Sequence, residues 1–452
     1  MSMGARGIAK KFIPTKTFKK IEPLGHLGEA VLVNAISGFP VKGLKVIGVT
    51  GTNGKTTTAF IIQRMLHEAG YKVGLMTTVA TGVGKDIKSQ FEHTTTPGGM
   101  KLIKAIKKLK KEGIEYLVME TTSHALAQHR VWGVPYSVAV MTNMSHEHLD
   151  YHGTFEKYRD AKRIMFQMCN ANKKGLRTGI VNADDATAKY FAADIANAVT
   201  YGMKEGDLKA RSVRLSPSGS RYIVQIGDDE YHIHCRLPGS FNVYNSLAAV
   251  GVGRALGLSV KQIQDGIEAL EGVEGRMTHI DEGQDFDVIV DYAHTPDSFE
   301  KLFKDLRPVV EGKLIVMFGS AGRRDEAKRA VQGKLAGEYA DEVIVTEEDD
   351  RDMDGTAILD EIAKGAEKVG KVRNKDLFLV HDRTEAIQTA VNRAKKGDTV
   401  LLLGKGHEKD ILRNGPRAAE LRHLQQDDHN TERVVEFKWD EIEEAHAALK
   451  RR

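Results

Sequence analysis

Two hydrophobic patterns alternate along the chain from Leu44 onward: short apolar runs rich in Val and Ile, and longer segments with the period of an amphipathic helix. This alternation is typical of a parallel sheet covered by helices. In the first half, the clearest predicted strands are 44–50, 115–119, 137–141 and 179–181. Residues 155–168 have the period of a helix. We therefore expect an α/β fold built on a parallel sheet.

The pattern changes twice further along the chain. Residues 205–237 alternate polar and apolar positions around glycines, which predicts antiparallel strands. The alternation of strand and helix resumes after Gly275, with predicted strands at 288–291, 314–318, 342–345 and 399–403. Because the core pattern lapses in the polar stretch 281–285, we place a domain boundary near residue 280. A second, Rossmann-like α/β domain is expected after it.

The composition is that of a globular protein, since 41% of the 452 residues are hydrophobic and 28% are charged. No stretch approaches the roughly 20 apolar residues that cross a bilayer, and the start lacks a signal peptide's apolar run. We expect a cytoplasmic protein without integral membrane association. The net charge of +4 gives no reason to expect a nucleic-acid partner. Cys169 and Cys235 form no CxxC pattern, so neither a disulfide framework nor a thiolate zinc site is expected.

The first 20 residues are basic and contain no acid. Their cations are Arg6, Lys10, Lys11, Lys16, Lys19 and Lys20. Such a segment can bind an anionic substrate or a membrane surface. A solvated, partly frayed terminus is the simpler interpretation.

A glycine-rich loop follows the first strand and opens a helix. It reads Gly51, Thr52, Asn53, Gly54, Lys55, Thr56, Thr57. Backbone N–H groups and the helix dipole favour phosphate at such a place, so we predict ATP binding, with Lys55 reaching the terminal phosphates and Thr56 ligating Mg²⁺. The spacing differs from GxxxxGK[ST], because Val49 stands where the first glycine would be. The shorter GTNGKT form resembles that of Mur ligases and folylpolyglutamate synthetases.

Polar residues also leave the ends of later strands. Glu120 to His124 end one apolar strand, and a histidine-rich run, 142–152, follows another. Carboxylates and imidazoles at the carboxyl ends of parallel strands lie where such sheets bind ligands. His146 and His148 also have a spacing that suits zinc, although further ligands are not evident from spacing. The alternative interpretation is that these histidines lie on a surface loop and bind no ligand.

The run 120–166 resembles the central domain of MurE enzymes in the Mur ligase family. The family pattern is approximately E-x-S-S-H-x-L-x-x-x-R, then T-N-x-x-x-D-H-L-D-Y-H-G, then A-K and L-F. The resemblance implies that Glu120 and His148 bind a second Mg²⁺ and that Lys162 is carbamylated. A carbamate turns a cation into an anion that ligates metal. Without the resemblance, Lys162 is one lysine on an amphipathic helix.

The same resemblance implies an acceptor site for a nucleotide-sugar substrate. Thr122 and Arg130 take the positions of its contacts. Residues 94–97, Thr-Thr-Thr-Pro, resemble the substrate-binding TTP of the family, which implicates Thr95 and Thr96.

Further nucleotide contacts are implied by three later motifs, which are residues 237–245 (LPGSFNVYN), 275–276 (GR) and 291–296 (DYAHTP). The implied ATP-binding residues are Asn242, Asn245, Arg276, Asp291 and His294. Arg276 would approach the γ-phosphate. Asn242 is also compatible with simple capping of a helix.

The amino-acid site is implied by residues 404–408, which read GKGHE as in MurE. Gly404 and Glu408 would contact the incoming amino acid, Glu408 through an amine, and Arg324 would pair with its carboxylate. The family motif DNPR is replaced by residues 348–351, Glu-Asp-Asp-Arg. Arg351 keeps a carboxylate partner, whereas acids such as Asp349 suit an extra cationic amine.

The resemblance covers about residues 43–445. We therefore expect a short basic N-terminal arm (1–42), a central ATP-binding domain (43–280) and a C-terminal domain (281–452). MurE enzymes usually have a complete domain for the uridine nucleotide before GTNGKT, whereas 50 residues precede Gly51 here. Either the basic arm replaces that domain, or the acceptor is another acyl compound.

The resemblance implies an ATP-dependent, ADP-forming ligase that joins an amino acid to a carboxylate through an acyl phosphate, with the third residue of the UDP-linked muramoyl peptide of peptidoglycan as the expected addition. ATP and two Mg²⁺ ions are the expected cofactors, and a monomer is expected. The implied catalytic residues are Lys55, Glu120, His148, Lys162 and Arg276. The alternatives are a folylpolyglutamate-type ligase, against which DYAHTP and GKGHE argue, and a non-catalytic nucleotide-binding protein, against which the joint presence of these residues argues.

Overall fold

The computed structural model describes residues 15–89, 96–216, 219–421 and 432–452, so the predicted contact Thr95 lies outside the described residues. The chain forms two compact units. The central unit comprises residues up to Arg214, Arg221–Cys235 and Asn242–Leu270. The C-terminal unit comprises Leu215–Ser220, Arg236–Phe241 and Glu271–Arg452. The domain boundary near residue 280 stays a prediction.

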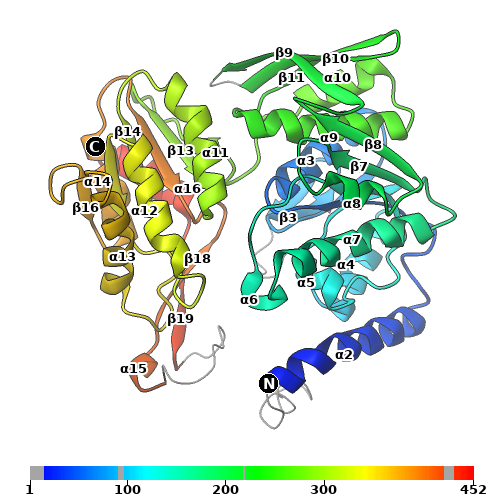
Figure 1. The fold of residues 1–452 in the computed structure, drawn as a ribbon, viewed down its shortest axis with the longest axis horizontal. Helices are drawn as coiled ribbons and strands as arrows, with labels where there is room; N and C mark the ends of the chain where they lie inside the picture. Colours follow the sequence, from blue (N-terminus) through cyan, green and yellow to red (C-terminus); the bar gives the residue numbers. More distant parts are fainter. Residues whose placement is uncertain (1–14, 90–95, 217–218, 422–431) are drawn as a thin grey trace. The chain divides into compact units, whose positions relative to one another are not determined.

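The central unit is built on an eleven-stranded sheet (Figure 1). In order along the sheet, its strands are β11 (Asp229–Cys235), β10 (Gly219–Ile226), β9 (Leu208–Ser216), β8 (Asn197–Gly202), β7 (Thr178–Asn182), β6 (Tyr136–Met141), β1 (Lys45–Thr50), β5 (Tyr116–Glu120), β2 (Val73–Met76), β3 (Ala80–Val83) and β4 (Asp86–Ser89). The ladder from β2 to β9 is parallel, and β3 and β4 add an antiparallel edge. The predicted parallel α/β fold is confirmed.

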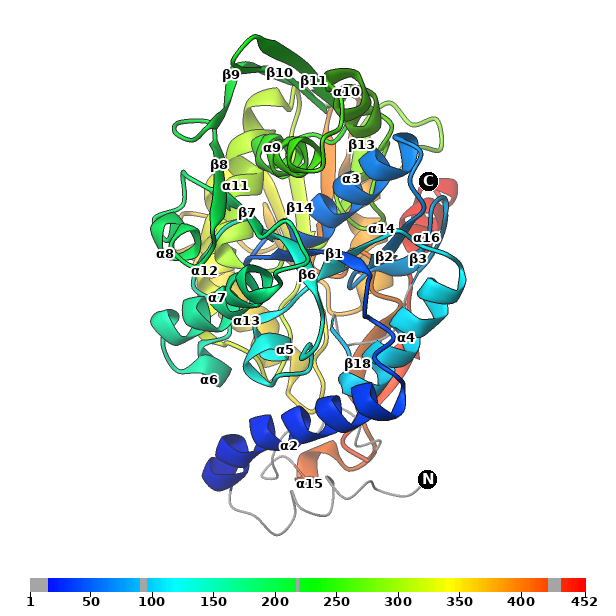
Figure 2. The same ribbon diagram turned by 90° about the vertical axis from the view of Figure 1, so that its right-hand side faces the viewer.

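Helices cover this sheet, and their ends follow local sequence. They are α2 (Thr15–Ile36), α3 (Lys55–Glu68), α4 (Gly99–Lys111), α5 (Ser123–Ala127), α6 (Leu149–His152), α7 (Phe155–Ala171), α8 (Ala188–Ala192), α9 (Ser240–Ala255) and α10 (Val260–Glu268). Thr154 caps α7 by accepting a hydrogen bond from the Lys157 N–H, which satisfies a donor that the first helical turn leaves unpaired. Every residue of β5 and β6 is buried, as expected for strands covered on both faces. Figure 2 shows α2 beneath α4 and α5.

The C-terminal unit is a second α/β layer structure. Its sheet has the order β12 (Thr278–His279), β13 (Asp287–Asp291), β17 (Thr399–Leu403), β14 (Leu314–Phe318), β15 (Glu342–Val345) and β16 (Leu377–Leu379), parallel except for β12. The helices are α11 (Pro296–Leu306), η1 (Arg307–Val309), α12 (Ala327–Tyr339), α13 (Gly355–Glu367), α14 (Arg383–Arg393), α15 (Ala418–Leu421) and α16 (Glu441–Lys450). A hairpin of β18 (Asp410–Asn414) and β19 (Val434–Lys438) completes the unit.

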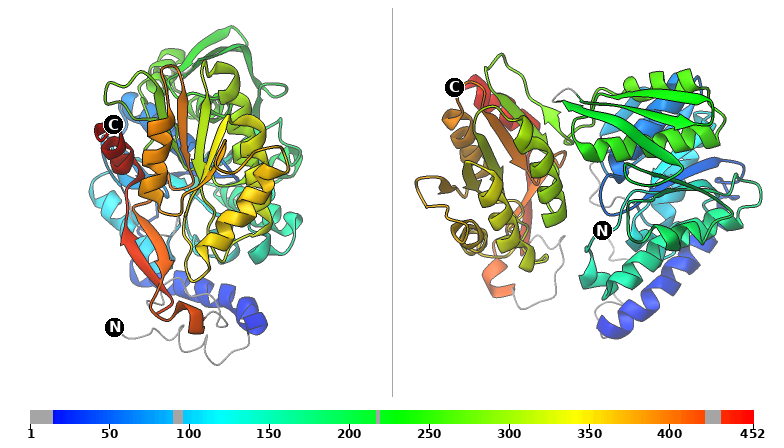
Figure 3. Two further views of the ribbon diagram at one scale, coloured as in Figure 1. Left: turned by 90° about the vertical axis from the view of Figure 1, so that its left-hand side faces the viewer. Right: turned by 45° about the horizontal axis from the view of Figure 1, so that its top comes forward.

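Two separate hydrophobic clusters hold this second sheet between helices. One cluster joins the sheet to α11, α12 and α13, and the other joins it to α14 and α16. Figure 3 shows these helices packed against the strands. Helices on both faces of a parallel sheet make the Rossmann-like arrangement that the sequence predicted. Among the described residues of both units, no helix is long and apolar enough to span a membrane.

Candidate active site

The glycine-rich loop joins β1 to α3 in the central unit. Gly54 precedes the first residue of α3 and has a φ of 80°, a left-handed conformation that favours glycine. A Cβ atom at Gly54 would lie 2.4 Å from Oδ1 of Asn245, so a larger residue does not fit without displacing that side chain. Lys55 Nζ donates a 2.8 Å hydrogen bond to the Thr52 carbonyl. The loop therefore combines backbone N–H groups, a helix start and a lysine, as phosphate binding requires.

Glu120 is the centre of the polar contacts beside this loop. It ends β5, next to β1 in the sheet, and is 2% exposed. Its Oε2 accepts hydrogen bonds from Thr56 Oγ1 at 2.9 Å and from Thr78 N and Oγ1, each at 3.1 Å. Lys55 Nζ lies 3.9 Å from Oε1. A carboxylate and a threonine hydroxyl are hard oxygen donors, which fit Mg²⁺.

Lys162 of α7 reaches the same loop from the other side. It is 2% exposed, and its Nζ donates a 2.6 Å hydrogen bond to the Gly51 carbonyl. Burial lowers the pKa of Lys162 well below its usual value, the charge of Lys55 lowers it further, and Glu147 and Glu120 oppose the shift. A buried amine pushed toward its neutral form is a nucleophile. A carbamate at this position would carry a negative charge and would ligate a metal ion.

His148 lies in a cluster of imidazole and phenol rings. Its Nε2 is 3.7 Å from Oε2 of Glu147, and its ring centroid is 4.7 Å from that of His124. Among the described residues, the group of His, Cys, Asp and Glu side chains close enough to hold a metal is Glu347, Asp350 and His381. The zinc alternative for His146 and His148 thus gains no support, and the role of His148 in Mg²⁺ binding stays a prediction.

The described residues predicted for the acceptor lie together. Arg130 Nη1 donates a 2.5 Å hydrogen bond to the Thr96 carbonyl, and the Thr122 hydroxyl lies 3.4 Å from that of Thr96. The Thr96 hydroxyl in turn donates to the Glu120 carbonyl at 3.2 Å. The cluster is therefore connected to the end of β5, although its contact with an acceptor stays a prediction.

Asn245 of α9 lies against the phosphate loop, and Asn242 lies beside Asn245. Asn245 Nδ2 donates to Asn242 Oδ1 at 2.8 Å, and Thr58 Oγ1 of α3 donates to Asn245 Oδ1 at 3.1 Å. Because α9 begins at Ser240, Asn242 lies inside the first turn. The capping interpretation of Asn242 is therefore wrong.

In the C-terminal unit, Asp291 ends β13 and receives two backbone hydrogen bonds, from the N–H groups of Met277 and Ala293 at 2.8 and 2.7 Å. Burial raises the pKa of Asp291, while the positive charge of Arg276 opposes this rise. The Arg276 guanidinium lies 4.5 Å from the ring centroid of Tyr292. These contacts fix the turn that carries the DYAHTP motif, in which the His294 Nδ1 lies 2.9 Å from the Tyr292 carbonyl oxygen.

Lys405 connects two of the residues predicted to bind the amino acid. This side chain is fully buried, and its Nζ lies 3.1 Å from Asp349 Oδ1 and 2.7 Å from Glu408 Oε2. Burial lowers the pKa of Lys405, but the negative charges of Glu408 and Asp349 outweigh burial and raise it. Tyr292 OH donates to Glu408 Oε1 at 3.2 Å. Neither Lys405 nor Tyr292 was predicted as a site residue, although each stands inside a quoted motif.

The other predicted amino-acid contacts differ in burial. Arg351 is buried and donates a 2.5 Å hydrogen bond to the Gly322 carbonyl. Glu348 is buried beside Gly404, and its Oε2 has no hydrogen-bond partner among the described residues. Arg324 is exposed on the loop after β14. Burial of this Glu348 oxygen without a hydrogen-bond partner is energetically unfavourable. Its lack of a partner could not be predicted from the sequence.

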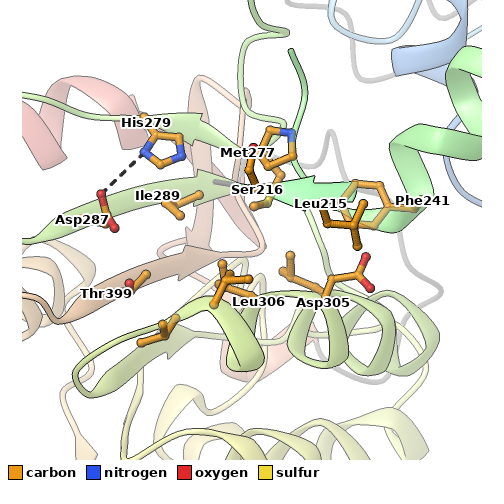
Figure 4. A pocket seen from close by; sticks show the side chains of 15 residues that line it. Leu215, Ser216, Phe241, Met277, His279, Asp287, Ile289, Asp305, Leu306 and Thr399 are labelled. Carbon is orange, nitrogen blue, oxygen red and sulfur yellow. Dashed lines mark ion pairs between the residues drawn. The ribbon is translucent and has the colours of Figure 1, made fainter. Parts of the chain in front are cut away.

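A small cavity of about 40 Å³ lies in the C-terminal unit (Figure 4). Most of its lining is apolar, including Phe241, Met277, Ile289 and Leu306. Across the lining, the ring of His279 lies 4.0 Å from a carboxylate oxygen of Asp287. None of the predicted site residues lines this cavity.

Comparisons with known proteins agree with this geometry. Residues 49–253 match the Mur ligase middle domain, and residues 275–406 match the Mur ligase glutamate ligase domain. A UDP-N-acetylmuramyl-tripeptide synthetase of Roseiflexus sp. is 42% identical over 402 residues, which cover 86% of this chain and 79% of the relative. A UDP-N-acetylmuramoyl-L-alanyl-D-glutamate--2,6-diaminopimelate ligase of Geobacillus kaustophilus is 41% identical, covering 84% and 77%.

Solved structures give the same result. The structure of a UDP-N-acetylmuramoyl-L-alanyl-D-glutamate--2,6-diaminopimelate ligase has a TM-score of 0.62 and 28% identity, covering 95% of this chain and 83% of that one. A folylpolyglutamate synthase of Mycobacterium tuberculosis has a TM-score of 0.68 at 15% identity, covering 89% and 96%, and shares the fold alone. The chain therefore belongs to the Mur ligase family of ATP-dependent, ADP-forming ligases, with relatives of the MurE type.

Proposed function

We propose that this ligase adds an amino acid to the carboxylate of a UDP-linked muramoyl dipeptide, the third residue of the peptidoglycan peptide. The observation that carries the proposal is the contact of Lys55 and Thr56, in the glycine-rich loop, with the buried Glu120. Lys162 donates a hydrogen bond to the same loop. The names of the relatives supply the substrate class. We also propose a cytoplasmic monomer, a state that light scattering on the purified protein would test.

The reaction begins with the acceptor carboxylate, whose oxygen attacks the γ-phosphorus of ATP, so that ADP leaves and an acyl phosphate forms. Lys55 and Arg276 neutralise charge that spreads over the transferring group. The amine of the incoming amino acid then attacks the acyl carbon, loses a proton and expels phosphate. Holding both substrates in position supplies much of the rate.

Mg²⁺ would be held by Thr56 and Glu120, with Lys162 and His148 as proposed further ligands. The ion would supply Lewis-acid stabilisation of the phosphate oxygens. The contacts of Glu120 support this assignment, because both its neighbours Thr56 and Thr78 give the carboxylate a fixed orientation. We propose two ions in all.

We propose that Lys162 carries a carbamate. Its neutral amine would attack the carbon of CO₂ and release one proton to water, and the carbamate that forms would carry a negative charge. Burial of the amine and its lowered pKa support this step, since only a neutral amine reacts. With ¹³C-bicarbonate, the parent protein should show a carbamate carbon resonance that Lys162→Met lacks. A resonance that persists in this variant would sink the assignment.

The amino acid is proposed to carry a second amine. Glu348, Asp349 and Glu408 lie near one another around the buried Lys405, so carboxylates outnumber cations there. A substrate ammonium would give the unsatisfied Glu348 oxygen a partner, and Arg351 and Arg324 would serve the substrate carboxylate. This acidic surplus favours a diamino acid over a neutral one.

The direct test is phosphate release with Mg-ATP, UDP-N-acetylmuramoyl-dipeptide and lysine, diaminopimelate or ornithine offered singly, with the product mass recorded. Turnover with one diamino acid is expected, and Lys55→Ala should abolish it with every pair. No turnover with any pair, despite intact ATP binding, would overturn the proposed acceptor. The search would then move to amino-acid ligation of acyl compounds that lack UDP.

A further inference from the structure

Helices α2 and α4 of the central unit lie side by side (Figure 2). At Gly99, the first residue of α4, a Cβ atom would lie 3.3 Å from Cα of Ala30 in α2. Asn34 of α2 donates a 3.3 Å hydrogen bond to the Trp132 carbonyl, in the segment after α5. These contacts fix the orientation of α2, so its outward face is defined.

The outward face of α2 carries large apolar side chains beside Glu29. The helix buries the polar side chains of His26 and Asn34, yet Leu32 and Ile36 are 59% and 77% exposed. Other exposed apolar side chains beside them are Val31, Phe39, Met100 and Trp132. A helix that meets only water has the opposite pattern, with polar residues outward. An apolar group of this size on one surface marks an interaction site.

Helix α4, which packs beside α2, carries positive charge. Its buried face is aliphatic, whereas its exposed residues include Lys101, Lys104, Lys107, Lys108, Lys110 and Lys111. No acidic residue lies between Gly99 and Lys111. Lys110 Nζ donates to the carbonyls of Pro40 and Lys42, which ties this helix to the segment after α2. We call the exposed apolar residues of α2 and its neighbours, together with the α4 lysines, the α2–α4 face.

We propose that the α2–α4 face binds the surface of an anionic phospholipid membrane. Lysines are attracted to the negative headgroups, while Leu32 and Ile36 enter the boundary between headgroups and acyl chains. Trp132 suits that boundary, where tryptophan is enriched. The basic residues at 1–20, left without a role by the proposed reaction, continue the same charge along the chain. The exposed lysines of α4 outnumber the exposed acids Glu29 of α2 and Glu112 after α4. This excess of positive charge beside apolar residues favours an anionic membrane.

The proposal is tested by flotation of the full chain with vesicles of phosphatidylglycerol and phosphatidylcholine, compared with phosphatidylcholine alone. Binding is expected to the anionic vesicles, and salt should weaken it by screening. The change of Lys104, Lys107 and Lys108 to Gln should weaken binding by at least about tenfold, because each lysine contributes near the surface. Leu32→Ser with Ile36→Ser should weaken it similarly.

Matched controls use side chains elsewhere that are equally exposed. Changing Lys173, Lys174 and Lys209 to Gln removes the same charge, and Val372→Ser removes an apolar side chain that is 51% exposed. These controls should bind as the parent does. None of the substituted residues belongs to the proposed active site, so ATP turnover checks folding in every variant.

Three results would overturn the proposal. They are no binding to anionic vesicles, equal binding to neutral ones, and an equal loss of binding in the controls. The protein could instead self-associate without binding vesicles. If Leu32→Ser with Ile36→Ser abolished that self-association, the face would be assigned to a second copy of the chain.

Discussion

The amine of Lys162 donates a 2.6 Å hydrogen bond to the carbonyl oxygen of Gly51. This contact joins the middle of α7 to the first residue of the glycine-rich loop, two segments 111 residues apart in the chain. A buried lysine is destabilising unless it is paired or neutral. If Lys162 serves the proposed chemistry, substitution should separate its effect on activity from its effect on stability.

We expect Lys162→Met to unfold at a higher temperature than the parent in CO₂-free buffer, where Lys162 is an amine, while losing ligase activity. The lowered pKa of Lys162 means that the unfolded chain binds more protons than the folded one between the two pKa values, so parent stability rises with pH there. The variant lacks this dependence. Its advantage should therefore shrink as pH is raised from 7 toward the ordinary lysine pKa. Thermal unfolding across this range tests it, and an advantage that grows with pH would contradict it.

Gly54→Ala should impair nucleotide use far more than folding. The added Cβ would displace Asn245, and a displacement of this kind at a catalytic loop costs about 100-fold in turnover. Gly257→Ala is the matched control, because Gly257 has a φ of 78° and open space around it. The control should lose only about 1–2 kcal/mol of unfolding free energy. Equal turnover in the two variants would show that nucleotide use does not require a glycine at position 54.

Lys405→Met should destabilise the C-terminal unit. Removing one partner of a buried charge pair leaves Glu408 and Asp349 uncompensated, which costs about 3–5 kcal/mol. Adding Glu408→Gln to Lys405→Met should recover part of the loss. Denaturant unfolding of the single and double variants measures this coupling, and additive losses would show that the two side chains act independently.

Glu441→Gln should also be destabilising. Arg383 and Glu441 are both fully buried, and Arg383 donates to the two carboxylate oxygens of Glu441 at 2.8 and 2.6 Å, joining α14 to α16. Loss of the negative charge leaves the guanidinium uncompensated, at a cost of about 3–5 kcal/mol. Glu443→Gln, on the exposed side of α16, should change stability by less than about 0.5 kcal/mol. Urea unfolding would measure the free energy of unfolding of both variants.

Strong hydrophobic periodicity determined much of the fold in advance. The buried strands β1, β5, β6, β13, β14 and β17 lie where apolar runs predicted them, because strands covered on both faces require such runs. Short or edge elements gave weaker signals. Only the first residue of β3 and of β16 is buried, and Asp86 and Lys88 of β4 are exposed, so these strands need no long apolar run. The regular helix α2 also went unpredicted in what the sequence suggested was a frayed arm.

The sequence by itself determined the motifs and, through them, the family. Only the tertiary structure decided how side chains far apart in the chain are paired, as with Thr56 and Glu120, or Lys405 and Asp349. It alone also placed His26 and Asn34 of α2 inward and Leu32 and Ile36 outward. The physical reason is that burial and electrostatic compensation depend on every neighbour in space, whereas a motif records only neighbours along the chain.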